Sequence, residues 1–225
     1  MIRNLIWDAG GTLFDSYPAK IRAFGLALAE SGVAPHAPWI AGLLRQSTQH
    51  CIQTLAESHQ LDAGAFERRY RAHYDGIGPE AQPPFPGVVT VLRYICDIGG
   101  QNFIATHRER ESLHALLTAH HMAGYFAACI TKDDPYPRKP DPTAIEALLT
   151  SYGLSRGETM LIGDRDLDIQ AGKNAGIRTC FFGAEPHRVR ADVEAEDFGE
   201  FYRWLKAENA LIDSGDHDLR PHLGR

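Results

Sequence analysis

Three carboxylates, one hydroxyl and one lysine each lie at or just beyond the end of a short apolar run or in the loop that follows it. They are Asp8, Thr106, Lys139, Asp164 and Asp168. Clustered acids repel one another unless a cation lies among them, and ligands that are all oxygen suit Mg²⁺. A lysine and a hydroxyl beside such an ion can bind an anion, for which phosphate is the obvious candidate. These residue types therefore predict a site for magnesium and a phosphate group, provided that the fold gathers them.

The elements that must position these residues alternate along most of the chain. Short apolar runs typical of buried strands cover 4–8, 101–106, 127–131, 159–164 and 178–183. Helical periodicity covers 87–98, 109–119, 142–152, 166–175 and 199–211. This alternation predicts an α/β fold with a parallel sheet and helices on both faces. Such sheets bind ligands outside the carboxyl ends of their strands, which is where the candidate residues fall.

Residues 17–82 interrupt the alternation. They show helical periodicity only, in three stretches, and a segment rich in proline and glycine at 76–87 returns the chain to the α/β pattern. We therefore expect a helical insertion directly after the first strand. The predicted domains are a core of 1–16 and 83–212, a helical cap of 17–82, and a polar tail of 213–225.

Composition excludes several classes of protein. The 225 residues are 44% hydrophobic and carry a net charge of −6, so we expect neither nucleic acid nor a membrane as partner. The apolar run at the N-terminus is short and is interrupted by Asp8, which argues against a signal peptide. Four cysteines are scattered without a C-x-x-C pair, which favours reduced thiols and a cytoplasmic location.

Each candidate residue also has an ordinary structural interpretation. An Asp after a strand is often a turn former or a helix N-cap, as is a Thr such as Thr106, and Lys139 alone would be a solvated lysine. Asp166 is a plain acid in the first turn of a helix, where the helix dipole favours it. The joint pattern favours a site, because suitable groups follow successive core strands in order.

With these motifs in place, the sequence is similar to the haloacid dehalogenase-like hydrolase superfamily, in the phosphoglycolate phosphatase-like subgroup with a helical cap. The similarity rests on Asp8 after the first strand, Thr106, Lys139 within "KPDP", and "GDRDLD" with Asp164 and Asp168. It covers nearly the whole core, about 1–16 and 83–185. It implies a Rossmann-like three-layer core with an inserted helical cap, Mg²⁺ as cofactor, and a small phosphorylated metabolite as substrate.

The resemblance also implies a role for each matching residue. In this family the acid after the first strand is the nucleophile, and the metal is held partly by a backbone carbonyl two residues later. The expected roles are catalysis for Asp8, Thr106, Lys139 and Asp168, phosphate or substrate binding for Gly11, Thr106, His107 and Lys139, and metal binding for Asp8, Gly10 and Asp164.

The chain departs from the family pattern at Gly10. The family begins Asp-x-Asp-Gly-Thr, whereas this chain reads Asp8-Ala9-Gly10-Gly11-Thr12. The missing second acid protonates the leaving group in family phosphatases, which is help worth about 10²–10⁴-fold in rate. Glycine keeps the backbone carbonyl that the metal uses, so the departure removes the proton shuttle but not the metal site.

Three functions remain open at this point. The first is a phosphohydrolase that works through an aspartyl-phosphate at Asp8. The second is a barely active or non-catalytic relative that binds a phosphorylated ligand. The third is different chemistry on the same frame. Family members that cleave carbon–phosphorus bonds also lack the second acid, but they need a Schiff-base lysine in the cap, where Lys20 is the only lysine. Family dehalogenases dispense with the metal, so the intact "GDRDLD" argues against that chemistry.

Two further residues can be interpreted in two ways. His107 stands where the family often has a small polar residue, and it either touches the substrate or serves as a substitute acid, or it is an exposed loop histidine. Arg165 stands in place of the usual Ser or Thr, and it either adds positive charge for a phosphate or points to solvent.

Overall fold

The structure, a computed structural model, describes residues 1–184 and 186–213 and divides into two compact units. One unit comprises Met1–Phe14 together with the described chain from Pro84 onward, and the other is Asp15–Pro83. The expected helical insertion was 17–82. The expected tail, 213–225, lies outside the described residues except for Asp213.

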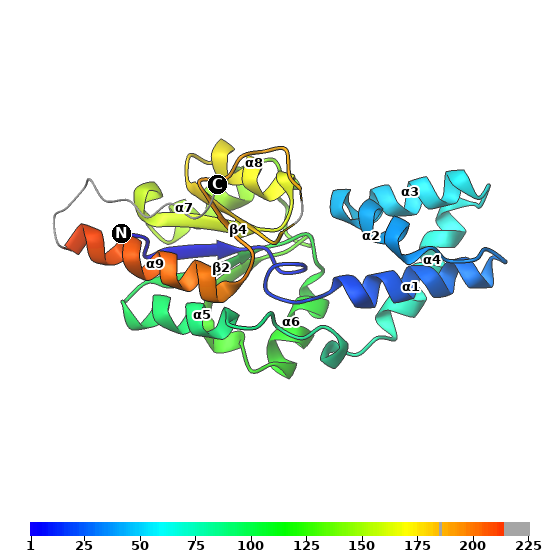
Figure 1. The fold of residues 1–225 in the computed structure, drawn as a ribbon, viewed down its shortest axis with the longest axis horizontal. Helices are drawn as coiled ribbons and strands as arrows, with labels where there is room; N and C mark the ends of the chain where they lie inside the picture. The colour runs from blue at the N-terminus through cyan, green and yellow to red at the C-terminus, as the bar shows by residue number, and fades with distance from the viewer. Residues whose placement is uncertain (185, 214–225) are drawn as a thin grey trace. The chain divides into compact units, whose positions relative to one another are not determined.

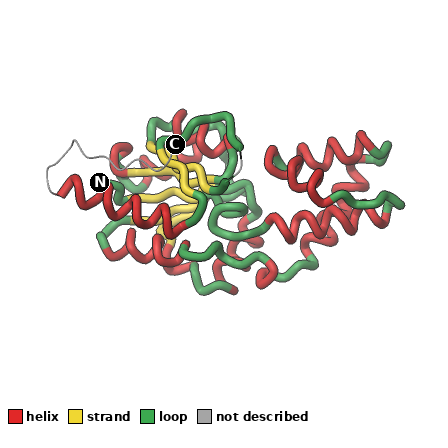
Figure 2. Tube along the Cα trace, in the orientation of Figure 1, coloured by secondary structure: helices red, strands yellow, loops and turns green. Residues whose placement is uncertain are grey.

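The first unit is built on a parallel sheet, whose strands are yellow in Figure 2. They follow the order β3-β2-β1-β4-β5-β6. The strands are β1 (Asn4–Trp7), β2 (Gln101–Ala105), β3 (Phe126–Ile130), β4 (Thr159–Gly163), β5 (Arg178–Phe182) and β6 (Val193–Ala195). β1 lies at the centre, with Trp7 paired to Ile104 of β2 and to Ile162 of β4. Residues that follow these three strands therefore meet at one edge of the sheet.

Helices cover both faces of the sheet and complete three layers (Figure 1). The helices are α5 (Val88–Asp97), α6 (Arg110–Ala119), α7 (Thr143–Ser151), α8 (Asp166–Asn174) and α9 (Phe198–Asp213), with short 3-10 turns at η2 (Ala123–Tyr125) and η3 (Arg156–Glu158). Side chains alternate along a strand, so Leu5 and Trp7 pack with α5, α6 and α9. Ile6 faces the other way and packs with α7 and α8.

The α/β class predicted from the sequence is confirmed, and one strand was missed. β6 has three residues, of which only Val193 and Ala195 are buried, and it pairs with β5 alone at the edge of the sheet. A run this short, within a polar segment, has no hydrophobic pattern that separates it from a loop.

The second unit is helical throughout its regular structure. Its elements are α1 (Tyr17–Glu30), α2 (Ala37–Gln46), α3 (Thr48–Ser58), α4 (Ala63–Asp75) and the 3-10 turn η1 (Pro79–Ala81). Its core includes Phe24, whose ring stacks on Tyr70 with the ring centroids 3.9 Å apart. The second of the three helical stretches expected within 17–82, residues 37–58, forms two helices rather than one. Ser47 between them is extended, and its hydroxyl accepts a hydrogen bond from the amide of His50 at the start of α3.

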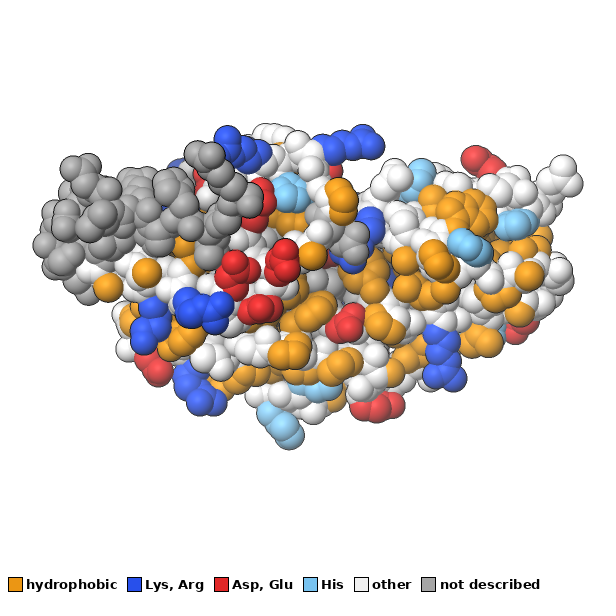
Figure 3. All heavy atoms as spheres, in the orientation of Figure 1, with side chains coloured by type: hydrophobic (Ala, Val, Ile, Leu, Met, Phe, Trp, Pro, Cys, Tyr) orange, Lys and Arg blue, Asp and Glu red, His pale blue; other side chains and the backbone are white. Residues whose placement is uncertain are grey.

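The surface carries charges of both signs. On the face of the α/β unit drawn in Figure 3, acidic and basic side chains are interspersed among hydrophobic ones. Among the helices that the structure describes, none combines the length and the apolar character needed to cross a bilayer.

Candidate active site

The edge of the sheet at the ends of β1, β2 and β4 gathers the residues that the sequence singled out. Asp8 follows β1, Thr106 follows β2 and Asp164 follows β4. Because these strands are neighbours, their carboxyl ends lie side by side. The three side chains are buried, with exposures of 1% for Asp8, 6% for Thr106 and 3% for Asp164.

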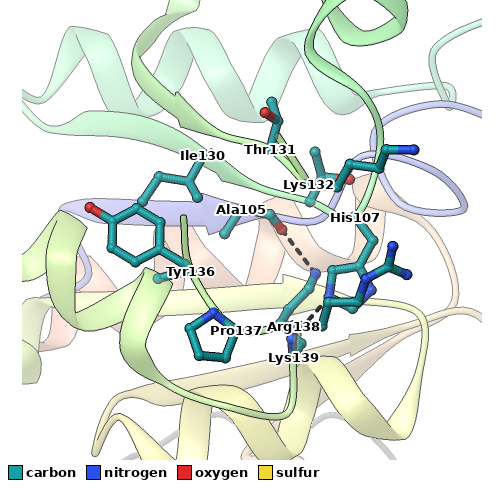
Figure 4. A pocket seen from close by; sticks show the side chains of 11 residues that line it. Ala105, His107, Ile130, Thr131, Lys132, Tyr136, Pro137, Arg138 and Lys139 are labelled. Atoms are coloured by element: carbon teal, nitrogen blue, oxygen red, sulfur yellow. Dashed lines mark hydrogen bonds between the residues drawn. The ribbon is translucent and has the colours of Figure 1, made fainter. Parts of the chain in front are cut away.

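Lys139 links two of the strand ends from a loop after β3. Its ammonium Nζ lies 2.6 Å from Oδ1 of Asp8 and 2.5 Å from Oδ1 of Asp168. It also donates a hydrogen bond of 2.9 Å to the carbonyl oxygen of Ala105 (Figure 4). Burial lowers the pKa of Lys139, but the charges of Asp168 and Asp8 raise it by more. The net shift is upward, so the ammonium stays charged.

Asp168 reaches Lys139 from the first turn of α8. The approach is close because Gly163 has no side chain, and a Cβ there would lie 2.3 Å from the Cβ of Asp168. Burial raises the pKa of Asp168 to about 6, against the opposing effect of Lys139. Asp168 is therefore a second carboxylate partner of Lys139, beside Asp8.

Asp8 is a carboxylate at neutral pH. Burial would raise its pKa, but the positive charges of Lys139 and Arg165 outweigh burial and lower the pKa to about 2. An ionised, buried carboxylate at a strand end can attack an electrophile or bind a cation.

The turn after Asp8 is shaped by its glycines. Gly11 adopts a φ of 95°, which side chains disfavour, and its amide donates to the carbonyl of Phe14 at 2.8 Å. This amide serves the turn itself, and phosphate binding by Gly11 stays a prediction. Thr12 donates its hydroxyl to Oδ1 of Asp164 at 3.1 Å and so orients that carboxylate.

The acids at this edge fit a hard divalent cation. Oxygen atoms of Asp8, Asp164 and Asp168 lie within 4.8 Å of one another, and all three side chains are buried. Carboxylate oxygens, with the carbonyl of Gly10 in the same turn, are the ligands that Mg²⁺ prefers. Lys139 pairs with both Asp8 and Asp168, so its single positive charge leaves the three acids with negative charge that a cation can neutralise.

His107 is half-buried and hydrogen-bonded. Its Nε2 accepts a bond of 2.9 Å from the amide of Lys139, so the ring is neutral with its proton on Nδ1 (Figure 4). Burial, together with Lys139 and Arg165, lowers its pKa to about 3. These two observations favour an orienting role over the role of a substitute acid.

A pocket opens beside this loop, between the ends of β2 and β3. Its lining includes Thr106, His107, Tyr136 and Arg138, of which the last three are labelled in Figure 4. The hydroxyl of Thr106 accepts a hydrogen bond of 3.2 Å from the amide of Arg108, which fixes the turn after β2.

The sequence left the direction of Arg165 open, and the structure points it inward. Its side chain is 13% exposed, with Nη2 lying 3.8 Å from Oδ1 of Asp8. Nothing in one sequence tells whether an arginine at a strand end turns toward a neighbouring acid.

In the helical unit, Lys20 lies on α1 with its ammonium 5.5 Å from the ring centroid of Tyr17.

Comparison with known proteins identifies the family of the chain. A family described as Haloacid dehalogenase-like hydrolase matches residues 5–182. The chain is 30% identical to a phosphoglycolate phosphatase of Yersinia pseudotuberculosis, covering 78% of each. It is 29% identical to the pyrophosphatase PpaX of Halalkalibacterium halodurans, over 94% of this chain and 96% of the relative. A solved hydrolase from Streptococcus pneumoniae is 32% identical, with a TM-score of 0.60 over 79% of this chain and 91% of that one.

The protein is thus built on a parallel α/β fold with a buried aspartate and lysine in contact at the ends of its strands, and its relatives are hydrolases. The chain belongs to the haloacid dehalogenase-like hydrolase family.

Proposed function

We propose that the protein is a phosphatase that hydrolyses a small phosphorylated molecule through an aspartyl-phosphate at Asp8. The observation that carries the proposal is the contact of 2.6 Å between Lys139 and Asp8 within a buried, all-oxygen acid cluster. The relatives named phosphoglycolate phosphatase and pyrophosphatase support the same class of substrate.

In the first step an oxygen of Asp8 attacks the phosphorus atom. A bond forms from the carboxylate to phosphorus, and the bond from phosphorus to the leaving oxygen breaks with its electron pair on that oxygen. Lys139 and the hydroxyl of Thr106 hold the phosphoryl oxygens during this exchange, with their positions fixed by Asp168 and by the turn after β2.

Asp8, the carbonyl of Gly10 and Asp164 would hold Mg²⁺, which supplies charge neutralisation for the phosphoryl group when it is bound. The chain's own part is to orient these oxygens, and Thr12 does so for Asp164 through their hydrogen bond of 3.1 Å.

In the second step water attacks the phosphorus of the aspartyl-phosphate. Inorganic phosphate is released with the water oxygen, Asp8 regains its carboxylate, and the proton of the water passes to phosphate or solvent. The family's acid is absent at Gly10, and His107 is held neutral with its Nε2 already accepting a hydrogen bond. We therefore infer that suitable substrates have leaving groups that are stable as anions, such as aryl phosphates, acyl phosphates and phosphoanhydrides.

A second candidate follows from the same absence. A relative that binds a phosphorylated ligand without turning it over would keep the lysine and the acid cluster and would dispense with the proton donor. Gly10 is the observation that favours this candidate.

A panel of substrates separates the two candidates. We expect Mg²⁺-dependent release of phosphate from an aryl phosphate, an acyl phosphate and pyrophosphate, with slow or absent release from alkyl esters. The matched control is Asp8→Asn, which keeps the shape of the side chain and removes the nucleophile, and it should release no phosphate. Equal activity in wild type and Asp8→Asn, or no turnover of any compound, would contradict the proposed phosphatase.

A further inference from the structure

Arg165 places a second cation at the nucleophile, and the proposed steps make no use of it. Its Nη2 lies 3.8 Å from Oδ1 of Asp8, the same oxygen that Lys139 contacts. Its Nε lies 3.6 Å from Oδ2 of Asp168. Only 13% of the Arg165 side chain is exposed, so the residue is largely buried at the site.

Arg165 changes the net charge of the acid cluster by one unit. The acid cluster holds three carboxylates, and Lys139 and Arg165 supply two positive charges, which leaves one net negative charge. Without Arg165 the same cluster would carry two. A divalent cation is attracted less strongly to the first arrangement, whereas a phosphate dianion is repelled less.

Arg165 is held from the N-cap position of α8, where its backbone is extended and its side chain makes no capping hydrogen bond. Its side chain is therefore directed at the acids rather than at the helix terminus. A guanidinium offers several N–H donors in one plane, a geometry that matches the oxygens of a phosphate.

We propose that Arg165 is a phosphate-binding residue, built in beside Lys139, that lets the site hold a phosphate anion without a divalent cation and weakens the affinity of the site for Mg²⁺. The proposal deepens the proposed function, on which its choice of ligand rests. In this arrangement Arg165 supplies part of the positive charge that the metal would otherwise supply to the phosphate.

The test measures binding rather than turnover, so its outcome is independent of whether the protein is a phosphatase. Calorimetric titrations would follow inorganic phosphate in the presence of EDTA, and Mg²⁺ alone in a second series. The variant is Arg165→Ser, because serine is a favoured N-cap residue and should preserve α8. Arg165→Lys keeps the charge, and Lys173→Ser removes an exposed charge from the last turn of the same helix as a matched control.

We expect Arg165→Ser to bind phosphate about tenfold more weakly and Mg²⁺ about tenfold more tightly, a factor that corresponds to about 1.4 kcal/mol. Arg165→Lys should restore part of both changes, and Lys173→Ser should match the wild type. The proposal is overturned if the wild type binds no phosphate in EDTA, or if Arg165→Ser leaves either affinity unchanged. Should phosphate bind as expected in a protein that hydrolyses nothing, the role of Arg165 stands and the phosphatase proposal fails.

Discussion

At the scale of single residues, the proposed mechanism makes Gly10 the position that limits which phosphate compounds the site can process. The turn takes its left-handed conformation at Gly11, with a φ of 95°, and Gly10 is not among the glycines of the described chain with positive φ. An L-residue at position 10 therefore requires no left-handed backbone. The backbone at position 10 is therefore compatible with an aspartate, so substitution can test the effect of the missing acid.

Gly10→Asp should raise the rate on alkyl phosphates by up to about 10²–10⁴-fold, the usual worth of one acid–base group. The physical reason is that an alkoxide leaves poorly without a proton, which the new carboxyl group supplies. Gly10→Asn is the control, because it has nearly the same size and no titratable proton. Initial rates on a series of alkyl and aryl phosphates measure the effect.

The result bears directly on the choice between the two candidate functions. A Gly10→Asp protein that is folded, binds Mg²⁺ and still hydrolyses no alkyl ester faster than Gly10→Asn would count strongly against the phosphatase. It would favour the phosphate-binding relative.

His107 should make the fold less stable in acid. Its pKa is lowered from the usual 6.5 to about 3 by burial and by the charges of Lys139 and Arg165. Between these values the unfolded chain binds a proton that the folded chain does not bind. The free energy of unfolding should therefore fall as the pH drops from about 6.5 toward 3, by at most about 1.4 kcal/mol per pH unit.

Urea unfolding of wild type and His107→Asn between pH 7 and pH 4.5 tests this. Asp168 acts in the opposite sense, since its pKa is raised to about 6 and the folded state binds its proton first. The comparison between the two proteins isolates the histidine, and the variant should lose less stability in acid. Parallel curves for the two proteins would show that His107 does not titrate as expected.

At the scale of elements, the close approach of β4 to α8 sets the position of Lys139. Gly163 ends β4, and a Cβ there would lie 2.3 Å from the Cβ of Asp168 in the first turn of α8. Asp168 is in turn the partner of Lys139 at 2.5 Å. A small residue at one strand end thus lets Asp168 come close enough to contact the lysine.

Gly163→Ala should lower the free energy of unfolding by about 1–3 kcal/mol, the usual range for an overpacked core, because Asp168 must move. Gly124→Ala is the matched control, since its added methyl group meets nothing within 4 Å. Thermal and urea unfolding of both variants provide the measurement. Equal stability of the two variants would contradict the tight contact.

The elements that position the site were predictable, whereas several of their contacts were not. β1, β2 and β4 are buried runs, so their ends could be placed from hydrophobicity alone. The break at Ser47 follows from a capping hydrogen bond rather than from a change of periodicity. The inward direction of Arg165 depends on Asp8 and Asp168, which chain folding brings beside it from different segments.

At the scale of the whole molecule, a ligand that binds only the folded state stabilises all of the chain that unfolds with the site. Mg²⁺ at 100 times its dissociation constant adds about 2.7 kcal/mol. For a chain of this length, each kcal/mol raises the melting temperature by about 2–4 °C. We therefore expect saturating Mg²⁺ to raise the melting temperature by roughly 5–10 °C.

Asp164→Asn should remove this shift, because it takes one charge from the site that Asp8, Gly10 and Asp164 would form. Asp97→Asn, an exposed acid on α5, is the control for a general effect of lost negative charge and should keep the shift. Differential scanning calorimetry with and without Mg²⁺ measures both. A shift of equal size in Asp164→Asn and the wild type would place the ion elsewhere, and it would contradict the proposal that Arg165 weakens Mg²⁺ binding at this site.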